Sequence, residues 1–474
     1  MSSTSPNKMN HRPLGATEQL FYKMREYGGI NALSFAHGIV NSNSSVDTPI
    51  FDASRMESAI KRIQSNSFLL CSTIKSHQDA IQFQYCEQKE LPLTIIHDAD
   101  IHQFNEQLEK ALTVSYDDEH LLWSITILYY KDDPTKFSII AAFDHTIADG
   151  TSMCYFIDSL LKTYNNISNV GINNDIPATK YQPIEPDLES FTQYKITAKD
   201  ILNFAPNEIS KMISPPMQPD FISLANADKR ITKTQYKRFS KEKTNGLLSS
   251  AKKNNTTIHG LIVAVFLFTA AKQKWLEIKT KTKSPEFNNL KLSTTNNVSF
   301  RNEFDIPNQQ TGVYISAVNS QFKLTKDTDI WQLAKAVNQS ITLKKQKKLH
   351  ISSTLIFEWL QRLMSDAFRI NLLNNHTQGR LETLCVSNVG KLNISGSYGD
   401  IELTDIGICG GQHGFGPSYM MLPLSFKQQL SYVFHYIAPL TSDSQAETMC
   451  QEINKLLDQC THQKALSLYE FSMQ

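Results

Sequence analysis

The chain has 474 residues, which is longer than one hydrophobic core usually fills. Hydrophobic residues make up 41% of it and charged residues 20%, a balance typical of globular proteins. The formal net charge of +1 argues against a nucleic-acid-binding protein and against a strongly basic membrane binder. Any anionic ligand must therefore meet cations that are local to its site.

Targeting, membrane and metal signals are missing from the sequence. Residues 1–10 are polar, and the longest apolar stretch, 261–271, is too short to span a bilayer. The seven cysteines are scattered, with no C-x-x-C pair that would indicate zinc or a redox site, and His259 and His413 have no ligand-spaced partners. We therefore expect a cytoplasmic protein with reduced thiols, no metal and no permanently bound cofactor.

The first part of the chain predicts both helices and strands. Residues 56–64 have the pattern of a helix. Residues 121–130 and 136–143 predict two strands that form a hairpin. Apolar residues at helical spacing follow, and Thr151 or Ser152 is the predicted cap of that helix.

A change in composition suggests where the chain divides. Residues 165–228 are rich in Asn, Pro, Ser and Asp, and Pro215 and Pro216 oppose regular structure. The predicted domains are an N-terminal lobe, a linker and a C-terminal lobe, at 1–190, 191–235 and 236–474.

The second part repeats the mixture of helices and strands. Thr256 or Thr257 can cap a helix that contains Leu261. Ser442 and Gln445 form a capping box before the last long helix. The other predicted elements are a helix at 330–342 and strands at 312–322, 384–387, 418–425 and 429–437. Helices mixed with antiparallel strands in both halves predict an α/β fold of the α+β type.

The most informative segment is 143–150, with the sequence Phe-Asp-His-Thr-Ile-Ala-Asp-Gly. His145 lies where the predicted hairpin ends and a loop to the next helix begins, a common place for chemistry. An imidazole is uncharged near neutral pH, so it can take the proton of a hydroxyl that attacks a carbonyl. Alternatively, His145 is only a satisfied polar group at a strand end. Asp149 can orient the ring or point away, and Gly150 permits a tight turn.

Further segments resemble the superfamily of thioester-dependent acyltransferases. It includes chloramphenicol acetyltransferase, the plant BAHD enzymes, the alcohol and polyketide-associated O-acyltransferases, and the condensation domains of peptide synthetases. The resemblance extends over nearly the whole chain and rests on the His145 motif and on residues 12–18, 122–123, 257–260, 298–301 and 386–390.

Two departures favour one branch of this superfamily. Condensation domains usually carry two adjacent histidines, but here Asp144 precedes His145. The BAHD motif D-F-G-W-G is absent, and residues 412–417 are its nearest echo. The chain is thus most similar to the alcohol and polyketide-associated O-acyltransferases.

The resemblance implies two chloramphenicol-acetyltransferase-like lobes with largely antiparallel mixed sheets, which form a pseudo-dimer around a tunnel within a monomer. It implies transfer of an acyl group from acyl-CoA, or from an acyl carrier protein, to a small-molecule alcohol or, less readily, an amine. His145 and Asp149 are the candidate catalytic residues. In relatives the aspartate pairs with the arginine that Arg301 matches, so Arg301 and Gly150 support the site.

Other candidate residues remain open to simpler interpretations. Ser387 and Asn388 can supply an oxyanion donor or line the tunnel, but Asn388 can also just stabilise a turn. Lys344, Lys345, Lys347 and Lys348 can contact CoA phosphates or a carrier protein, or form a solvated helix end. The glycine-rich run 407–416 lacks the features of a P-loop and predicts a flexible tunnel-lining loop. Alternative functions are a condensation-type domain that acts on carrier-bound substrates and a non-catalytic binding protein of the same fold.

Overall fold

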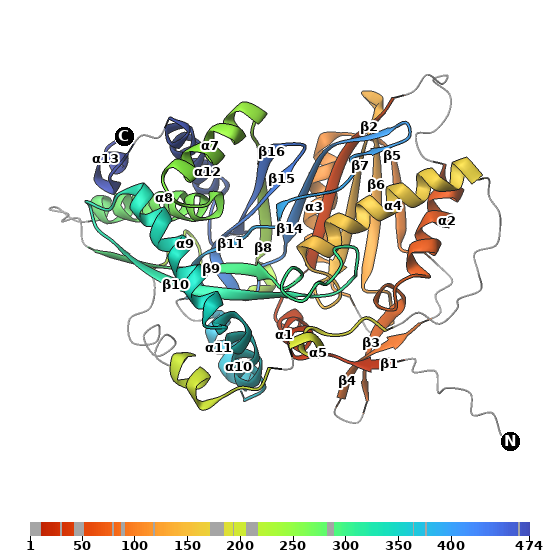
Figure 1. Cartoon of the computed structure of the whole chain (residues 1–474), viewed down its shortest axis with the longest axis horizontal. Helices are drawn as coiled ribbons and strands as arrows, with labels where there is room; N and C mark the ends of the chain where they lie inside the picture. Colours follow the sequence, from red (N-terminus) through yellow and green to blue (C-terminus); the bar gives the residue numbers. More distant parts are fainter. Residues whose placement is uncertain are drawn as a thin grey trace.

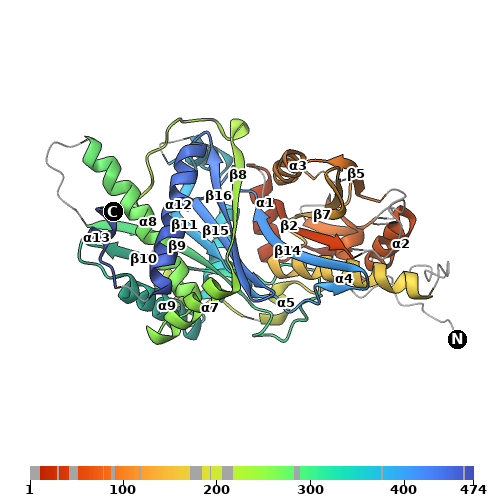
Figure 2. The ribbon, with the colours of Figure 1, turned by 90° about the horizontal axis from the view of Figure 1, so that it is seen from above.

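The computed structural model describes most of the chain. The described residues are 11–28, 31–41, 52–77, 80–86, 91–116, 119–170, 184–192, 194–204, 217–281, 289–363, 365–374, 377–462 and 465–474. Two sheets lie side by side, each covered by helices, and together they form two lobes (Figures 1 and 2). This mixed, two-lobed α/β architecture confirms the fold class predicted from the sequence.

The first lobe is built on one mixed sheet. In spatial order its strands are β13 (Ser397–Tyr398), β14 (Ile401–Gly410), β2 (Asn31–Val40), β7 (Asp133–Asp144), β6 (Trp123–Tyr130) and β5 (Leu93–Ala99). Strands β6 and β7 form the predicted hairpin. Helices α3 (Ile101–Thr113) and α4 (Gly150–Val170) cover opposite faces of the sheet (Figure 2), and α2 (Ala53–Gln64) packs beside α4.

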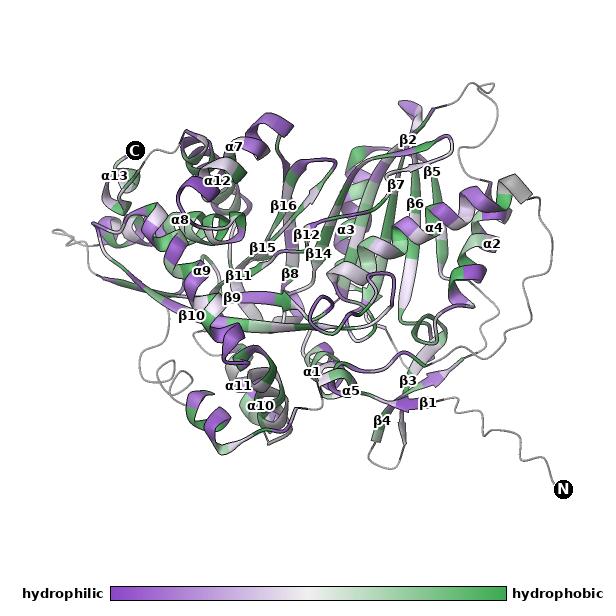
Figure 3. Cartoon of the chain, in the orientation of Figure 1, coloured by the Kyte–Doolittle hydropathy of each residue, from purple (hydrophilic) through white to green (hydrophobic). Residues whose placement is uncertain are grey.

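Alternation along β7 explains why both faces of this sheet are covered. Ile139 and Ala141 are buried in the core that includes α4, whereas Ile140 and Ala142 are buried in the core that includes α3. Successive strand residues point to opposite faces, so an unbroken apolar run requires helices on both sides. Figure 3 shows hydrophobic colouring over parts of β6 and β7.

Strand β14 reaches the first lobe from the second half of the chain. It pairs antiparallel with β2, with Gly407 opposite Phe35. The predicted flexible loop at 407–416 is therefore wrong, because its first residues lie in β14 and Gly416 begins β15 (Gly416–Phe426). A Cβ at Gly407 would collide with the Phe35 ring, so this glycine makes room for a side chain within a sheet.

The second lobe contains the other large sheet. In spatial order its strands are β10 (Ile315–Leu324), β9 (Leu290–Ser299), β11 (Arg380–Ser387), β15, β16 (Gln429–Ala438) and β8 (Ile231–Arg238), and β12 (Gly390–Lys391) pairs with β15. The helices of this half are α7 (Lys241–Lys253), α8 (Ile258–Lys281), α9 (Ile330–Gln346), α10 (Leu349–Leu363), α11 (Asp366–Asn374), α12 (Asp443–Thr461) and α13 (Leu468–Ser472). The core lies between the sheet and helices α8 and α12.

Most elements predicted in the second half are confirmed. Helix α12 begins with the predicted capping box, in which Ser442 and Gln445 bond each other's backbone N–H groups. The Thr257 hydroxyl accepts a hydrogen bond from the Gly260 N–H at the start of α8. The strand predicted at 312–322 begins later, at Ile315, because Gly312 instead forms a bridge with the first lobe.

A third, small sheet packs against the core of the first lobe, to which its Ile74 and Phe83 belong. This sheet has the order β1 (His11–Pro13), β4 (Ala80–Tyr85) and β3 (Ser72–His77), and helices α1 (Ala16–Arg25) and α5 (Leu188–Thr192) lie near it (Figure 1). Strand β8 begins within the range predicted for the linker, and Pro215 and Pro216 lie outside the described residues.

Candidate active site

His145 follows directly on β7, at the edge where the two lobes meet. The Asp144 carboxylate holds the turn by accepting hydrogen bonds from the Thr146 N–H at 2.9 Å and the Thr146 hydroxyl at 2.7 Å. Ala148 then forms a parallel bridge with Gly312 of the second lobe, and the Asp149 N–H donates to the Gly312 carbonyl at 3.1 Å. The loop that carries His145 is therefore bonded to both lobes.

Asp149 points away from the imidazole and into the interface. Its fully buried carboxylate accepts from Arg301 Nη2 at 3.1 Å and from the Tyr314 N–H at 3.1 Å. It also accepts from the Ser152 N–H at 2.8 Å, so Asp149 is the cap of α4. The predicted cap at Thr151 or Ser152 is thus wrong, because Ser152 already lies inside the helix.

Arg301 links this carboxylate to the rest of the second lobe. Its guanidinium is 2% exposed and donates to the carbonyls of Pro307 at 2.6 Å and Gln310 at 3.1 Å. It also donates to the Ser152 hydroxyl at 2.7 Å, and that hydroxyl is 2.9 Å from the Gly312 carbonyl. Two segments, 149–152 and 301–314, thus converge on one buried ion pair, and the Asp149 carboxylate has a structural position in it.

The imidazole of His145 is stacked on an aromatic ring. The ring centroids of His145 and Phe21, on α1, are 4.1 Å apart with an interplanar angle of 9°. Burial lowers the pKa of His145 below 6.5 and outweighs the Asp144 and Asp149 carboxylates and the nearby backbone, which act in the opposite direction. The ring is therefore neutral at pH 7, the state that a general base requires.

Asp144, where condensation domains have their first histidine, has its own partner. Its second carboxylate oxygen lies 3.1 Å from Arg25 Nη1, at the end of α1. This ion pair joins α1 to the loop of His145. Arg25 and Phe21 were missed from the sequence, because contacts over more than a hundred residues leave no local pattern.

The segment with Ser387 and Asn388 lies close to the start of α4. A Cβ placed on Gly150 would be 3.1 Å from Val389 Cγ2 and 3.3 Å from Ile408 Cδ1, so this glycine permits close packing. The Asn388 Oδ1 atom accepts from the Gly390 N–H at 2.8 Å, which is the turn-stabilising contact. Gly390 has a φ of 82°, a conformation that favours glycine.

The lysine cluster lies at the end of α9. Lys344 donates to the backbone and side chain of β10, at Asn319 and Ser320, whereas Lys345, Lys347 and Lys348 are exposed.

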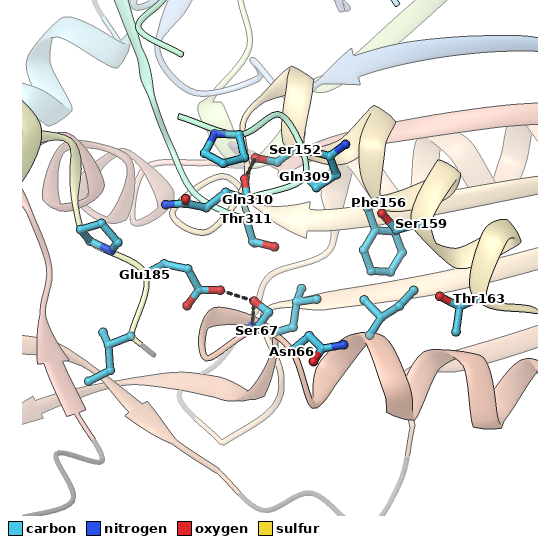
Figure 4. A pocket seen from close by; sticks show the side chains of 15 residues that line it. Asn66, Ser67, Ser152, Phe156, Ser159, Thr163, Glu185, Gln309, Gln310 and Thr311 are labelled. Carbon is cyan, nitrogen blue, oxygen red and sulfur yellow. Dashed lines mark hydrogen bonds between the residues drawn. The ribbon is translucent and has the colours of Figure 1, made fainter. Parts of the chain in front are cut away.

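One cavity lies next to the buried ion pair of Asp149 and Arg301. It has a volume of about 540 Å³ and lies between α2, α4 and residues 307–311 (Figure 4). Ser152 and Gln310 link its wall to the buried ion pair, and Glu185 bonds the Ser67 hydroxyl across it at 2.5 Å. His145 does not line this cavity, so a tunnel to His145 stays a prediction.

Two further features concern metal ligands and membrane-spanning helices. The described residues contain no group of three His, Cys, Asp or Glu side chains placed to hold a metal ion. His259 instead bonds the Asn296 amide oxygen at 3.0 Å. None of the described helices combines the length and the hydropathy that a bilayer crossing needs.

Known structures share this arrangement of two lobes with mixed sheets. The trichothecene 15-O-acetyltransferase of Fusarium sporotrichioides superposes with a TM-score of 0.74 at 10% identity, over 96% of this chain and 97% of that one. The condensation domain of the monacolin K polyketide synthase gives 0.66 at 11% identity, over 97% and 99%. The chain thus has the fold of the two-lobed acyltransferase and condensation-domain superfamily.

A sequence family narrows this class. Residues 228–409 match the family model of the phthiocerol/phthiodiolone dimycocerosyl transferase C-terminus. Polyketide synthase associated protein 5 from Mycobacterium tuberculosis superposes with a TM-score of 0.64 at 13% identity, over 95% of this chain and 98% of that one. The similarity to the polyketide-associated acyltransferases expected from the sequence is confirmed. No curated protein sequence matches the chain significantly.

Proposed function

We propose that this protein transfers an acyl group from a thioester to a hydroxyl of a small-molecule acceptor, with His145 as general base. The observation that carries the proposal is a neutral imidazole on a loop held by both lobes. The acyltransferase fold and the family match of residues 228–409 support the same reaction class. The proposed donor is acyl-CoA, with a carrier-protein thioester as the alternative, and no metal or bound cofactor is required.

The chemistry follows from the state of His145. A hydroxyl attacks a carbonyl fast only if its proton is removed during the attack. The imidazole takes that proton as the acceptor oxygen bonds to the thioester carbon. When the carbon–sulfur bond breaks, the imidazolium returns the proton to the leaving thiolate. The products are an ester and a free thiol, and the imidazole returns to its neutral state.

Supporting roles are proposed for other residues. Ser387 and Asn388 lie in the segment that packs against Gly150, so they are the candidate donors to the oxyanion of the tetrahedral intermediate. The exposed Lys345, Lys347 and Lys348 are candidates for contact with CoA phosphates or with an acidic carrier. The cavity of Figure 4 is a poorer place for phosphates, because the described residues of its wall include no Lys, Arg or His.

Replacing the base tests the proposal directly. His145→Ala should lower turnover on the order of 10²-fold to 10⁴-fold, because a general base contributes that much. Product formation is measured by mass spectrometry with a panel of acyl-CoAs and alcohols, and the thermal midpoint shows that the variant is folded. A folded variant with activity within a few-fold of the wild type would remove His145 from the reaction.

The acyl donor that the protein accepts distinguishes transfer from acyl-CoA from condensation-type chemistry on carrier-bound substrates. Free acyl-CoA should be consumed by the purified chain, with thiol release followed by a colorimetric reagent. Turnover only with an acyl chain tethered to a carrier protein would favour the condensation-type alternative. A chain that binds acyl-CoA but turns over neither donor would match a non-catalytic protein of this fold.

A further inference from the structure

Helix α1 packs directly over the candidate base. Its Phe21 ring lies 4.1 Å from the His145 ring, centroid to centroid, and the two planes are nearly parallel at 9°. Helix α1 thus presents a flat aromatic surface to the imidazole. Both residues keep part of their surface exposed, so the stack lies at the border of the interior.

Among the described residues, no side chain anchors the imidazole by a hydrogen bond, and the backbone of His145 and Ala148 supplies its only polar contacts that affect its pKa. Its buried Nδ1 atom makes no hydrogen bond of normal geometry to a described residue. Asp149, the nearby carboxylate that could orient it, is used by Arg301, Ser152 and Tyr314. The orientation of a base is normally set by the partner of its second nitrogen. Here a stacked ring is in the position to perform that task.

Helix α1 is itself held firmly. Near its start, Glu18 pairs with Arg12 at 2.7 Å, and the Thr17 hydroxyl donates to Glu189 at 3.0 Å. At its end, Arg25 pairs with Asp144 at 3.1 Å, next to His145 itself. Phe21 lies between these attachments. Its ring is therefore presented from a rigid helix, as a positioning group must be.

We propose that Phe21 is the positioning residue of the base: its ring sets the plane of the His145 imidazole and shields one face of it from water. The proposal rests on the catalytic role of His145 and deepens it. The charged groups near the imidazole are Asp144 and Asp149 on its own loop and Arg25 on α1. These stay in place when Phe21 is changed, so the effect of the stack can be measured separately from theirs.

The test is a ring titration combined with kinetics. Phe21→Ala admits water to the imidazole, so the pKa of His145 should rise toward 6.5 and the acid limb of kcat/KM should move to higher pH. Misorientation of the base should lower kcat about tenfold, with KM within about threefold of wild type. The titration is followed by ¹⁵N–¹H NMR of histidine-labelled protein, with His145 assigned from the spectrum of His145→Gln.

Two further variants complete the design. Phe21→Tyr keeps a flat ring and should retain both the titration and the turnover of the wild type. Phe21→Leu keeps apolar volume without a flat ring and should behave like Phe21→Ala, which covers the case in which the alanine variant fails to fold. Unchanged His145 titration and kcat in a folded Phe21→Leu variant would overturn the proposal. Full activity of His145→Ala would instead refute the proposed function. The titration of His145 in the Phe21 variants would still show whether Phe21 shields the imidazole.

Discussion

Asp149 illustrates how one buried side chain can serve several elements at once. It caps α4, pairs with Arg301 and accepts from the backbone of Tyr314. A carboxylate removed from water is tolerated only when its charge and its hydrogen bonds are satisfied together. The contacts of Asp149, four residues after His145, are therefore those of a residue that holds the loop.

Asp149→Asn should reduce stability more than chemistry. Removing one charge of a buried pair leaves Arg301 uncompensated, and we expect a loss of about 3 kcal/mol or more in the free energy of unfolding. Urea unfolding measures the loss, and the exposed Asp132→Asn is the matched control. Turnover per folded molecule should fall much less than in His145→Ala. A variant of normal stability with chemistry abolished would make Asp149 catalytic.

The pH dependence of activity is set by the same loop. A general base must be unprotonated, so kcat/KM should fall as the pH drops through the pKa of His145. Burial places that pKa below 6.5, so activity should persist below pH 6.5, where an exposed histidine would already be half protonated. A pH profile of kcat/KM in the wild type measures the limb. An acid limb at or above pH 6.5 would contradict the burial argument.

At the scale of elements, β14 joins the two halves of the chain. It pairs with β2 along its whole length, and Gly407 leaves room there for the Phe35 ring. Gly407→Ala should therefore force that buried ring to move, at a cost of about 1–3 kcal/mol. Gly410, on the same strand, has nothing within 4 Å of an added Cβ and is the matched control. Equal urea midpoints for Gly407→Ala and Gly410→Ala would contradict the packing.

Over the whole molecule, neutral buried histidines should make the fold acid-sensitive. Burial lowers the pKa of His37 and of His413 to about 4, and the cations Arg238 and Arg380 respectively add to the effect. Below pH 6.5 these histidines are protonated in the unfolded chain but stay neutral in the folded chain. The free energy of unfolding therefore falls as the pH drops from about 6.5 toward 4. Thermal midpoints across this range measure the loss, and His37→Gln should flatten it. A pH-independent midpoint would contradict the prediction.

Local sequence patterns were enough to predict many of the helices and strands and to single out His145. The hairpin before His145, the capping box of α12 and the cap of α8 depend on residues close together in the chain, and all three formed as predicted. Local periodicity and capping carry such information because helices and hairpins are made of short-range contacts. The expected pair of Asp149 and Arg301 came from a resemblance to known proteins rather than from spacing, and it forms.

The surroundings of His145 depend on contacts between distant segments. The stacking of Phe21 on His145 and the pairing of Arg25 with Asp144 join segments more than a hundred residues apart. Gly407 looked like part of a loop because a glycine that accommodates a neighbouring ring has the same local sequence as one in a turn. Such contacts follow from the packing of whole lobes, and no short window of sequence contains both partners.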